Sequence, residues 1–132
     1  MQAPSRSQIK LSFPSEPASV TELRHRAAAF AAEQGADDRL VADVNLAVSE
    51  AVTNAVKYAS KDDEAGTLEF VASAVGRWLE LRLTDKGESF GKGSPDGLGL
   101  GLTIIARLCD DLKIVQEGKG TSVLMRFALQ RD

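Results

Sequence analysis

Three chemically active side chains lie in one line along a predicted helix: Glu50, Asn54 and Lys57. At about 100° per residue they fall, together with Asp43, within about 60° of one another, on the side opposite two valines. A carboxylate can accept a hydroxyl proton, an amide oxygen can ligate Mg²⁺, and an ammonium can neutralise phosphate. The line therefore suits phosphoryl transfer from a nucleotide. The alternative is the solvated face of an amphipathic helix.

A second candidate for ligand binding is a run of glycines that leads into the third predicted helix. Gly97, Gly99 and Gly101 alternate with leucines just where that helix is expected to start, near Leu100. Glycines allow a backbone to approach a ligand closely, and the free N–H groups at a helix N-terminus favour anions. The run predicts a phosphate-binding loop, with a merely flexible loop as the alternative. It matches neither a P-loop nor a dinucleotide fingerprint.

The elements that must position these groups follow from hydrophobic periodicity and turn residues. Strands are expected at residues 8–13, 67–74, 78–85, 112–116 and 121–129, and helices at 17–35, 37–55 and 100–111. The strands after residue 66 form two antiparallel hairpins. This order predicts one domain over residues 1–132, an α+β two-layer sandwich with a mostly antiparallel sheet and helices on one face.

Two polar residues share the apolar side of their predicted strands. Asp85 has the same parity as Leu79, Leu81 and Leu83, and Thr121 has the parity of the apolar residues of the last strand. Both are therefore expected to point toward the helices. A carboxylate on the core side needs partners, because burying it without them is very costly. The alternative is that both residues mark strand ends close to water.

Composition excludes several other classes of protein. The net charge of −3 and a pI near 5.2 argue against a nucleic-acid-binding protein, and seven aromatic residues provide few stacking platforms. The single cysteine, Cys109, allows no internal disulfide and is expected to pack in the core of a protein from a reducing cytoplasm. With one histidine as well, no zinc cluster is expected. The sequence contains no signal peptide and no run of about 20 apolar residues.

Four segments, taken in order, resemble the GHKL ATPase superfamily, whose ATP-binding domain has the Bergerat fold. Residues 50–58 resemble its N-box, 84–87 its first glycine box, 97–101 its second and 120–121 the closing one. They occur in the order that the superfamily has, between residues 50 and 121. The short lid and the amino-acid sequence of residues 49–56 resemble those of a narrower group, the anti-sigma factor serine/threonine kinases of RsbW and SpoIIAB type.

The resemblance implies a role for each residue of the adenine and metal sites. Asp85 would receive the adenine amino group, assisted by Gly87 and Thr121. Asn54 would hold Mg²⁺, and Glu50 would act as the base on a substrate serine. The cofactors implied are ATP and Mg²⁺.

The resemblance also implies roles at the phosphate and protein-binding surfaces. Lys57 matches a phosphate-contacting position of the histidine-kinase branch, and Gly97, Gly99 and Gly101 match the second glycine box. Arg24, on the first helix, matches a position that contacts the protein partner; the alternative is an ordinary solvated arginine. One residue departs from the pattern, because Ser89 stands where the first glycine box has its second glycine, at the start of the lid.

The function that the resemblance implies is an anti-sigma factor with serine/threonine protein kinase activity. It would bind a sigma factor and phosphorylate an anti-anti-sigma (STAS) protein, as a homodimer in the cytoplasm, without nucleic-acid or membrane partners. Glu50 favours this enzyme. The alternative, slightly favoured by Ser89, is a nucleotide-gated partner-binding module without phosphotransfer. A histidine-kinase ATPase module is a third possibility, less favoured because no helical phosphoacceptor segment is found.

Overall fold

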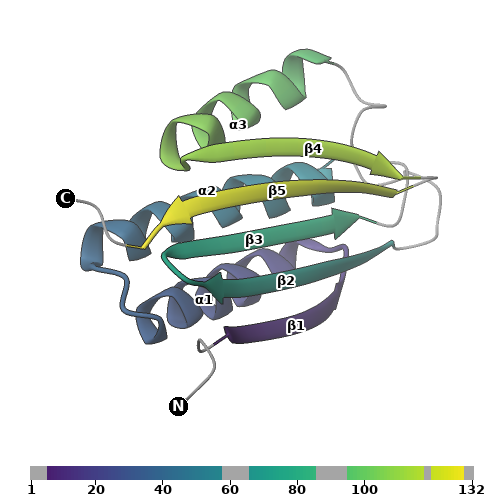
Figure 1. Ribbon diagram of the computed structural model, residues 1–132. Helices are drawn as coiled ribbons and strands as arrows, with labels where there is room; N and C mark the ends of the chain where they lie inside the picture. The colour runs from purple at the N-terminus through teal and green to yellow at the C-terminus, as the bar shows by residue number, and fades with distance from the viewer. Residues whose placement is uncertain (1–5, 58–65, 86–94, 118–119, 130–132) are drawn as a thin grey trace.

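The computed structural model describes residues 6–57, 66–85, 95–117 and 120–129 of the chain. Five strands and three helices follow one another in these residues (Figure 1): β1 Arg6–Pro14, α1 Pro17–Glu33, α2 Asp38–Lys57, β2 Thr67–Val75, β3 Trp78–Asp85, α3 Pro95–Leu108, β4 Asp111–Glu117 and β5 Gly120–Ala128. The predicted order of elements is confirmed. None of the helices in the described ranges has the length and hydropathy needed to span a bilayer.

The five strands form one antiparallel sheet in the order β1-β2-β3-β5-β4. Both predicted hairpins are present. The first turns at Gly76, whose φ of +60° suits the first central position of a two-residue hairpin turn. The pairing of β3 with β5 joins the two hairpins, and in its register Asp85 lies opposite Thr121.

The helices lie on one side of the sheet, as predicted, with α1 and α2 packed on each other behind it and α3 against α2 (Figure 1). The sheet face toward α1 and α2 is apolar because alternate residues of each strand point to it. It contributes Phe70, Leu81 and Met125 to a continuous hydrophobic core with both helices. Burial of a side chain of this size stabilises the fold by about 1.5–3 kcal/mol.

The ends of α1 and α2 follow from local sequence. Gly35, with φ of +94°, follows the last turn of α1 in a conformation that favours glycine. Two residues later the Asp37 side chain accepts a hydrogen bond of 2.8 Å from the Leu40 N–H. This bond satisfies one of the free donors of the first turn of α2.

The third helix begins earlier than predicted, at Pro95 and not near Leu100, and it ends at Leu108. Proline is well suited to the first turn, where its missing N–H has no intrahelical acceptor. The helical stripe also reaches back, because Leu98, Leu102, Ile105 and Cys109 have helical spacing. The last three of these pack against the core, which confirms core packing for Cys109.

Candidate functional site

A buried polar pair closes one end of the sheet. Asp85 is the last residue of β3 and lies opposite Thr121 near the start of β5. Their side chains are only 1% and 3% exposed. In each strand the alternate residues that share a face with Asp85 or Thr121 are part of the hydrophobic core. Both side chains therefore point to the helix side of the sheet. The prediction from strand parity is confirmed, and the alternative of strand ends open to water is wrong.

The line of polar residues on α2 is partly buried. Asn54 is 6% exposed, while Asp43 and Glu50 are half-buried. The Asn54 Nδ2 is also buried and has no hydrogen-bond partner. The water-facing side of α2 carries Leu46 and Thr53 instead. The interpretation of this line as a solvated face is therefore wrong for Asn54. Its amide occupies a position where a polar group requires a partner.

Four chain segments that carry the predicted site residues meet at one end of the molecule. In Figure 1 the C-terminal ends of α2 and β3, the start of β5 and the N-terminal end of α3 all lie on the right. The helix α2 contacts both β3 and α3. Asn54 lies in the last turn of α2, so the fold brings it to the same end as Asp85 and Thr121.

The three glycines of the predicted phosphate-binding run lie within α3. Gly97, Gly99 and Gly101 belong to its first two turns, so they form the N-terminal part of the helix and not a loop before it. The partial positive charge at a helix N-terminus favours an anion such as phosphate. The position of these glycines in the fold therefore still suits the chemistry predicted for them.

Some predicted site residues fall outside the described parts. Gly87 and the lid residue Ser89 belong to residues 86–94, and the Lys57 side chain at the end of α2 is likewise not described. Their roles stay predictions.

Arg24 lies in the middle of α1 and is half-buried. Its Nε is buried without a hydrogen-bond partner. Its neighbours His25 and Arg26 are exposed. Arg24 therefore differs from an ordinary solvated arginine, because its Nε is shielded from water and its N–H has no acceptor.

The thiol of Cys109, the residue directly after α3, is unreactive at neutral pH. Burial raises the pKa of the Cys109 thiol above its ordinary value of 9.0, and the nearby charges of Asp110 and Asp111 act in the same direction. Backbone hydrogen bonds from Cys109 and Asp111 lower the pKa, each by more than either aspartate charge raises it but by less than burial does. The thiol is accordingly protonated at neutral pH, which does not favour a nucleophilic role. In the described ranges no group of three His, Cys, Asp or Glu residues is placed to hold a metal ion.

One polar pair was not singled out from the sequence. The hydroxyls of Thr84 and Ser122 lie 2.7 Å apart and join β3 to β5 on the sheet face away from the helices. They are the chain neighbours of Asp85 and Thr121, and strand alternation places them on the opposite face. The signal that could have found them is the same parity argument applied across paired strands.

Comparison with known proteins identifies the family. The model of the histidine kinase-like ATPase domain matches residues 13–127. A serine-protein kinase RsbW of Listeria innocua is 32% identical over 89% of this chain and 85% of its own length. The RsbW of Bacillus licheniformis is 31% identical over 94% and 87% of the two chains.

Solved structures agree with this assignment at the level of the fold. The structure of the RsbU and RsbW domains of Rv1364c from Mycobacterium tuberculosis superposes with a TM-score of 0.77 at 23% identity. The match covers 99% of this chain and 34% of that longer one. The histidine kinase domain from Erythrobacter litoralis gives a TM-score of 0.60 at 21% identity, over 89% of this chain and 62% of the other. The chain therefore belongs to the histidine kinase-like ATPase family, in the group of the RsbW-type serine-protein kinases.

Proposed function

We propose that this protein is an anti-sigma factor that is also an Mg-ATP-dependent serine/threonine kinase. It binds a sigma factor and phosphorylates a serine or threonine of an anti-anti-sigma protein of the STAS class, in the cytoplasm. The names of relatives at 31–32% identity support the kinase. The observation that carries the nucleotide site is the burial of Asp85 beside Thr121, at the sheet end that α2 also reaches.

Asp85 and Thr121 form the adenine end of the proposed site, together with Gly87. A carboxylate accepts hydrogen bonds and donates none at neutral pH, so it matches the amino group at position 6 of adenine. Asp85 is 1% exposed at the end of a strand whose other core-side residues are leucines, and a hydrogen bond is stronger in such a shielded position than in water. This chemistry selects an amino purine over a purine that carries a carbonyl at the same position.

Asn54 fits the requirements of a magnesium ligand. Mg²⁺ bound to a nucleotide commonly takes one or two protein oxygens and completes its shell with phosphates and water. The Asn54 amide is buried, and its Nδ2 has no hydrogen-bond partner that would fix the orientation of the group. It can thus turn its oxygen to a cation. When bound, the ion would neutralise charge on the β- and γ-phosphates.

The phosphates of ATP would meet the N-terminal part of α3 and the Lys57 ammonium. Gly97, Gly99 and Gly101 keep this part of the helix surface free of side-chain bulk. Backbone N–H groups of the first turn supply donors, and the helix dipole adds favourable charge.

Glu50 is proposed as the base that accepts the hydroxyl proton of the substrate. It lies one helical turn before Asn54 and is half-buried. It is thus partly accessible to a second protein while remaining next to the proposed metal ligand. The Glu50 carboxylate would accept the proton of the substrate hydroxyl while the hydroxyl oxygen bonds to the γ-phosphorus, and the bond from the γ-phosphorus to the β–γ bridging oxygen would break to release ADP.

The half-buried Arg24 is proposed to contact the protein partner. A guanidinium with a buried, unsatisfied Nε offers a planar donor set to a partner carboxylate. We also propose a homodimer, in keeping with the family.

A paired kinetic and binding experiment tests the enzyme. Purified protein is incubated with Mg-ATP and the STAS proteins of the same genome, and phosphate on each STAS protein is measured by mass spectrometry. Glu50→Gln is expected to keep Mg-ATP affinity near wild type and to slow transfer by about 10²–10⁴-fold. Asn54→Ala is expected to weaken Mg-ATP binding and to abolish transfer. Thr53→Ala, an exposed change on the same helix, is the control.

The alternative function, a nucleotide-gated module without transfer, gives a different pattern. It predicts Mg-ATP binding that depends on Asn54, no phosphorylated STAS protein, and sigma-factor binding that changes with the nucleotide. A Glu50→Gln protein that phosphorylates at the normal rate removes the base role and leaves the rest of the site in place.

A further inference from the structure

The sheet face away from α1 and α2, here called the outer face, carries a hydroxyl pair directly behind the proposed adenine contacts. Thr84 lies opposite Ser122 in the strand register, and the next pair is Asp85 with Thr121. Strand alternation points the first pair to the outer face and the second to the helix side. The two pairs therefore share the peptide units 84–85 and 121–122 but lie on opposite faces of the sheet.

The hydroxyl pair is shielded from water, unlike its neighbours on the outer face of β3. Ser122 is 3% exposed and Thr84 is half-buried. The side chains of Glu80 and Arg82, on the same face, are exposed. A shielded hydroxyl needs a partner within the protein, and these two lie 2.7 Å apart. Their hydrogen bond is thus made where water competes little for it.

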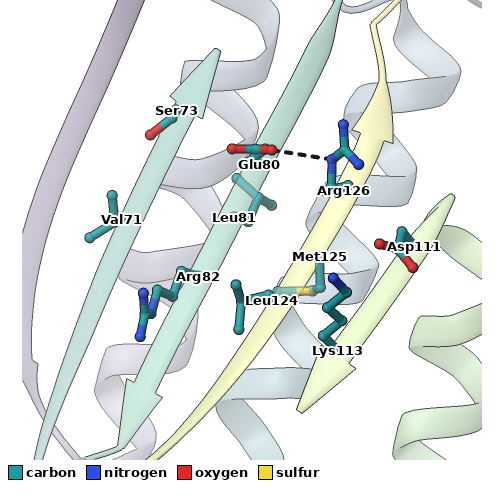
Figure 2. A pocket seen from close by; sticks show the side chains of 10 residues that line it. All are labelled: Val71, Ser73, Glu80, Leu81, Arg82, Asp111, Lys113, Leu124, Met125 and Arg126. Atoms are coloured by element: carbon teal, nitrogen blue, oxygen red, sulfur yellow. Dashed lines mark ion pairs between the residues drawn. The ribbon is translucent and has the colours of Figure 1, made fainter. Parts of the chain in front are cut away.

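Arg82 makes a second contact to the hydroxyl pair. Its Nε donates a long hydrogen bond of 3.4 Å to the Ser122 Oγ. The two residues are diagonal neighbours across the strands, because Arg82 lies opposite Leu124 (Figure 2). The aliphatic part of an arginine commonly covers neighbouring side chains while its charged end stays in water. Three side chains on the outer face therefore connect β3 to β5 just behind Asp85 and Thr121.

The proposed adenine contacts lie at the end of the β3–β5 ladder. In the register of the described residues, Asp85 and Thr121 are the last pair that these two strands form. Pairing on both sides along the chain restrains a residue in the middle of a strand, whereas a residue at the end has such pairing on one side only, and strand ends open most easily. A side-chain bond at the pair before the last therefore restrains the part of the ladder that carries the site.

We propose that Thr84 and Ser122 are positioning residues of the nucleotide site, acting from the face that the nucleotide does not touch. Their hydrogen bond fixes the twist of the two strand ends relative to each other, and with it the direction of the Asp85 carboxylate. This role rests on the proposed function, in which that carboxylate accepts a hydrogen bond from the adenine amino group. Such a bond weakens steeply as its angle departs from linear, so a small rotation of the strand end reduces it.

A hydroxyl pair suits this task better than an apolar pair of the same size. Valine and alanine at these two positions would keep the strands and most of the packing. Dispersion contacts depend on distance but have little directional preference, so they would hold the orientation of the strand ends less firmly. A hydrogen bond prefers both a distance and an angle. The chemistry of the pair therefore matches a need for orientation more than a need for burial.

A second link between the same two strands provides a matched control. Glu80 of β3 and Arg126 of β5 form an ion pair of 3.2 Å on the outer face, drawn as a dashed line in Figure 2. They lie opposite each other in the register, four residues along each strand from Thr84 and Ser122. This ion pair joins β3 to β5 without restraining the ends that carry the site. Glu80→Gln therefore tests whether any loss of β3–β5 contact has the same effect.

Titration calorimetry with ADP and inosine diphosphate, which has a carbonyl in place of the adenine amino group, tests the proposal. Thr84→Val keeps the side-chain shape and is expected to weaken ADP binding by about two- to tenfold, as for one misaligned hydrogen bond. Inosine diphosphate should bind as before, so the preference for ADP falls by the same factor. Ser122→Ala should match this result, and the double variant should lose no more, because the same bond is lost. Thr84→Ser retains a hydroxyl and should keep the wild-type preference, as should Glu80→Gln.

Urea unfolding establishes that each variant is folded. A folded Thr84→Val protein with the wild-type preference overturns the proposal, and so does equal weakening toward both nucleotides, which marks a purely structural role. Losses that add in the double variant, or a Glu80→Gln protein that loses the preference equally, overturn it too. If Asp85→Asn narrows the preference and Thr84→Val does not, only the positioning role fails. A wild type without a preference for ADP removes the adenine site, and the positioning role with it.

Discussion

The buried carboxylate at the end of β3 gives the sharpest test of the nucleotide site. We expect Asp85→Asn to weaken ADP binding while the protein stays folded. The amide is nearly the same size as the carboxylate, and at a position only 1% exposed it removes a charge that is costly to bury. The fold therefore loses little, and the change acts on the hydrogen bond to the base.

The magnitude follows from the kind of hydrogen bond that is lost. A hydrogen bond to a charged group contributes about 1.5–3 kcal/mol. Since about 1.4 kcal/mol corresponds to a factor of ten, the dissociation constant for ADP should rise by roughly 10- to 150-fold. The loss should lie toward the upper end, because the amide turns a donor toward the amino group of adenine in one of its two orientations.

Inosine diphosphate makes the experiment specific for the base. It carries a carbonyl where adenine has its amino group, so wild-type protein should bind it much more weakly than ADP. Asp85→Asn should narrow this preference, because an amide can donate to the carbonyl. Titration calorimetry with both nucleotides measures the effect. Glu80→Gln, on the same strand but on the outer face, is the matched control.

Two outcomes would contradict the adenine assignment. One is a folded Asp85→Asn protein that binds ADP as tightly as the wild type. The other is equal weakening toward ADP and inosine diphosphate, which would place the effect of Asp85 away from the base.

The other predictions concern the partner surface, a helix cap and the thiol. Arg24→Ala should weaken binding of the sigma factor or its antagonist by about tenfold or more in a pull-down titration, with ADP affinity unchanged. Asp37→Ala should lower the free energy of unfolding by about 1 kcal/mol in urea, because the Leu40 N–H loses its acceptor. Cys109 should react with a thiol reagent more slowly than in the unfolded chain. Its raised pKa adds stability that is present below the unfolded pKa and is lost as pH rises through the folded value, so Cys109→Ala should flatten the fall in stability at alkaline pH.

Local patterns were sufficient to predict most of this fold. Period-two alternation identified all five strands and, through parity, the face to which Asp85 and Thr121 point. The N-terminal cap of α2 is equally local, since the Asp37 side chain accepts a hydrogen bond from the N–H of Leu40, three residues later. Such features depend on neighbours in the chain, which a single sequence displays directly.

Features that depend on packing between distant segments could not be predicted from the sequence patterns. The pairing of β3 with β5 and the strand order cannot be obtained from alternation, because every strand offers the same pattern. The burial of Asn54 depends on how α2 packs against its neighbours. The spacing of polar residues along the helix could therefore not exclude a solvated face. The early start of α3 was obscured by Gly97 and Gly99, which lower helix propensity although the stripe continues past them.

Strand register connects the core to the site in this protein. Asp85 and Thr121 are opposite each other only because the leucines of β3 lie opposite Val123, Met125 and Phe127 of β5. A slip of one residue would move Asp85 to the outer face and expose the whole leucine set to water. The hydroxyls of Thr84 and Ser122 add a contact of 2.7 Å that holds the same register from the other side. Substitutions that loosen this end of the β3–β5 pair should therefore weaken nucleotide binding even where they touch neither side chain of the site.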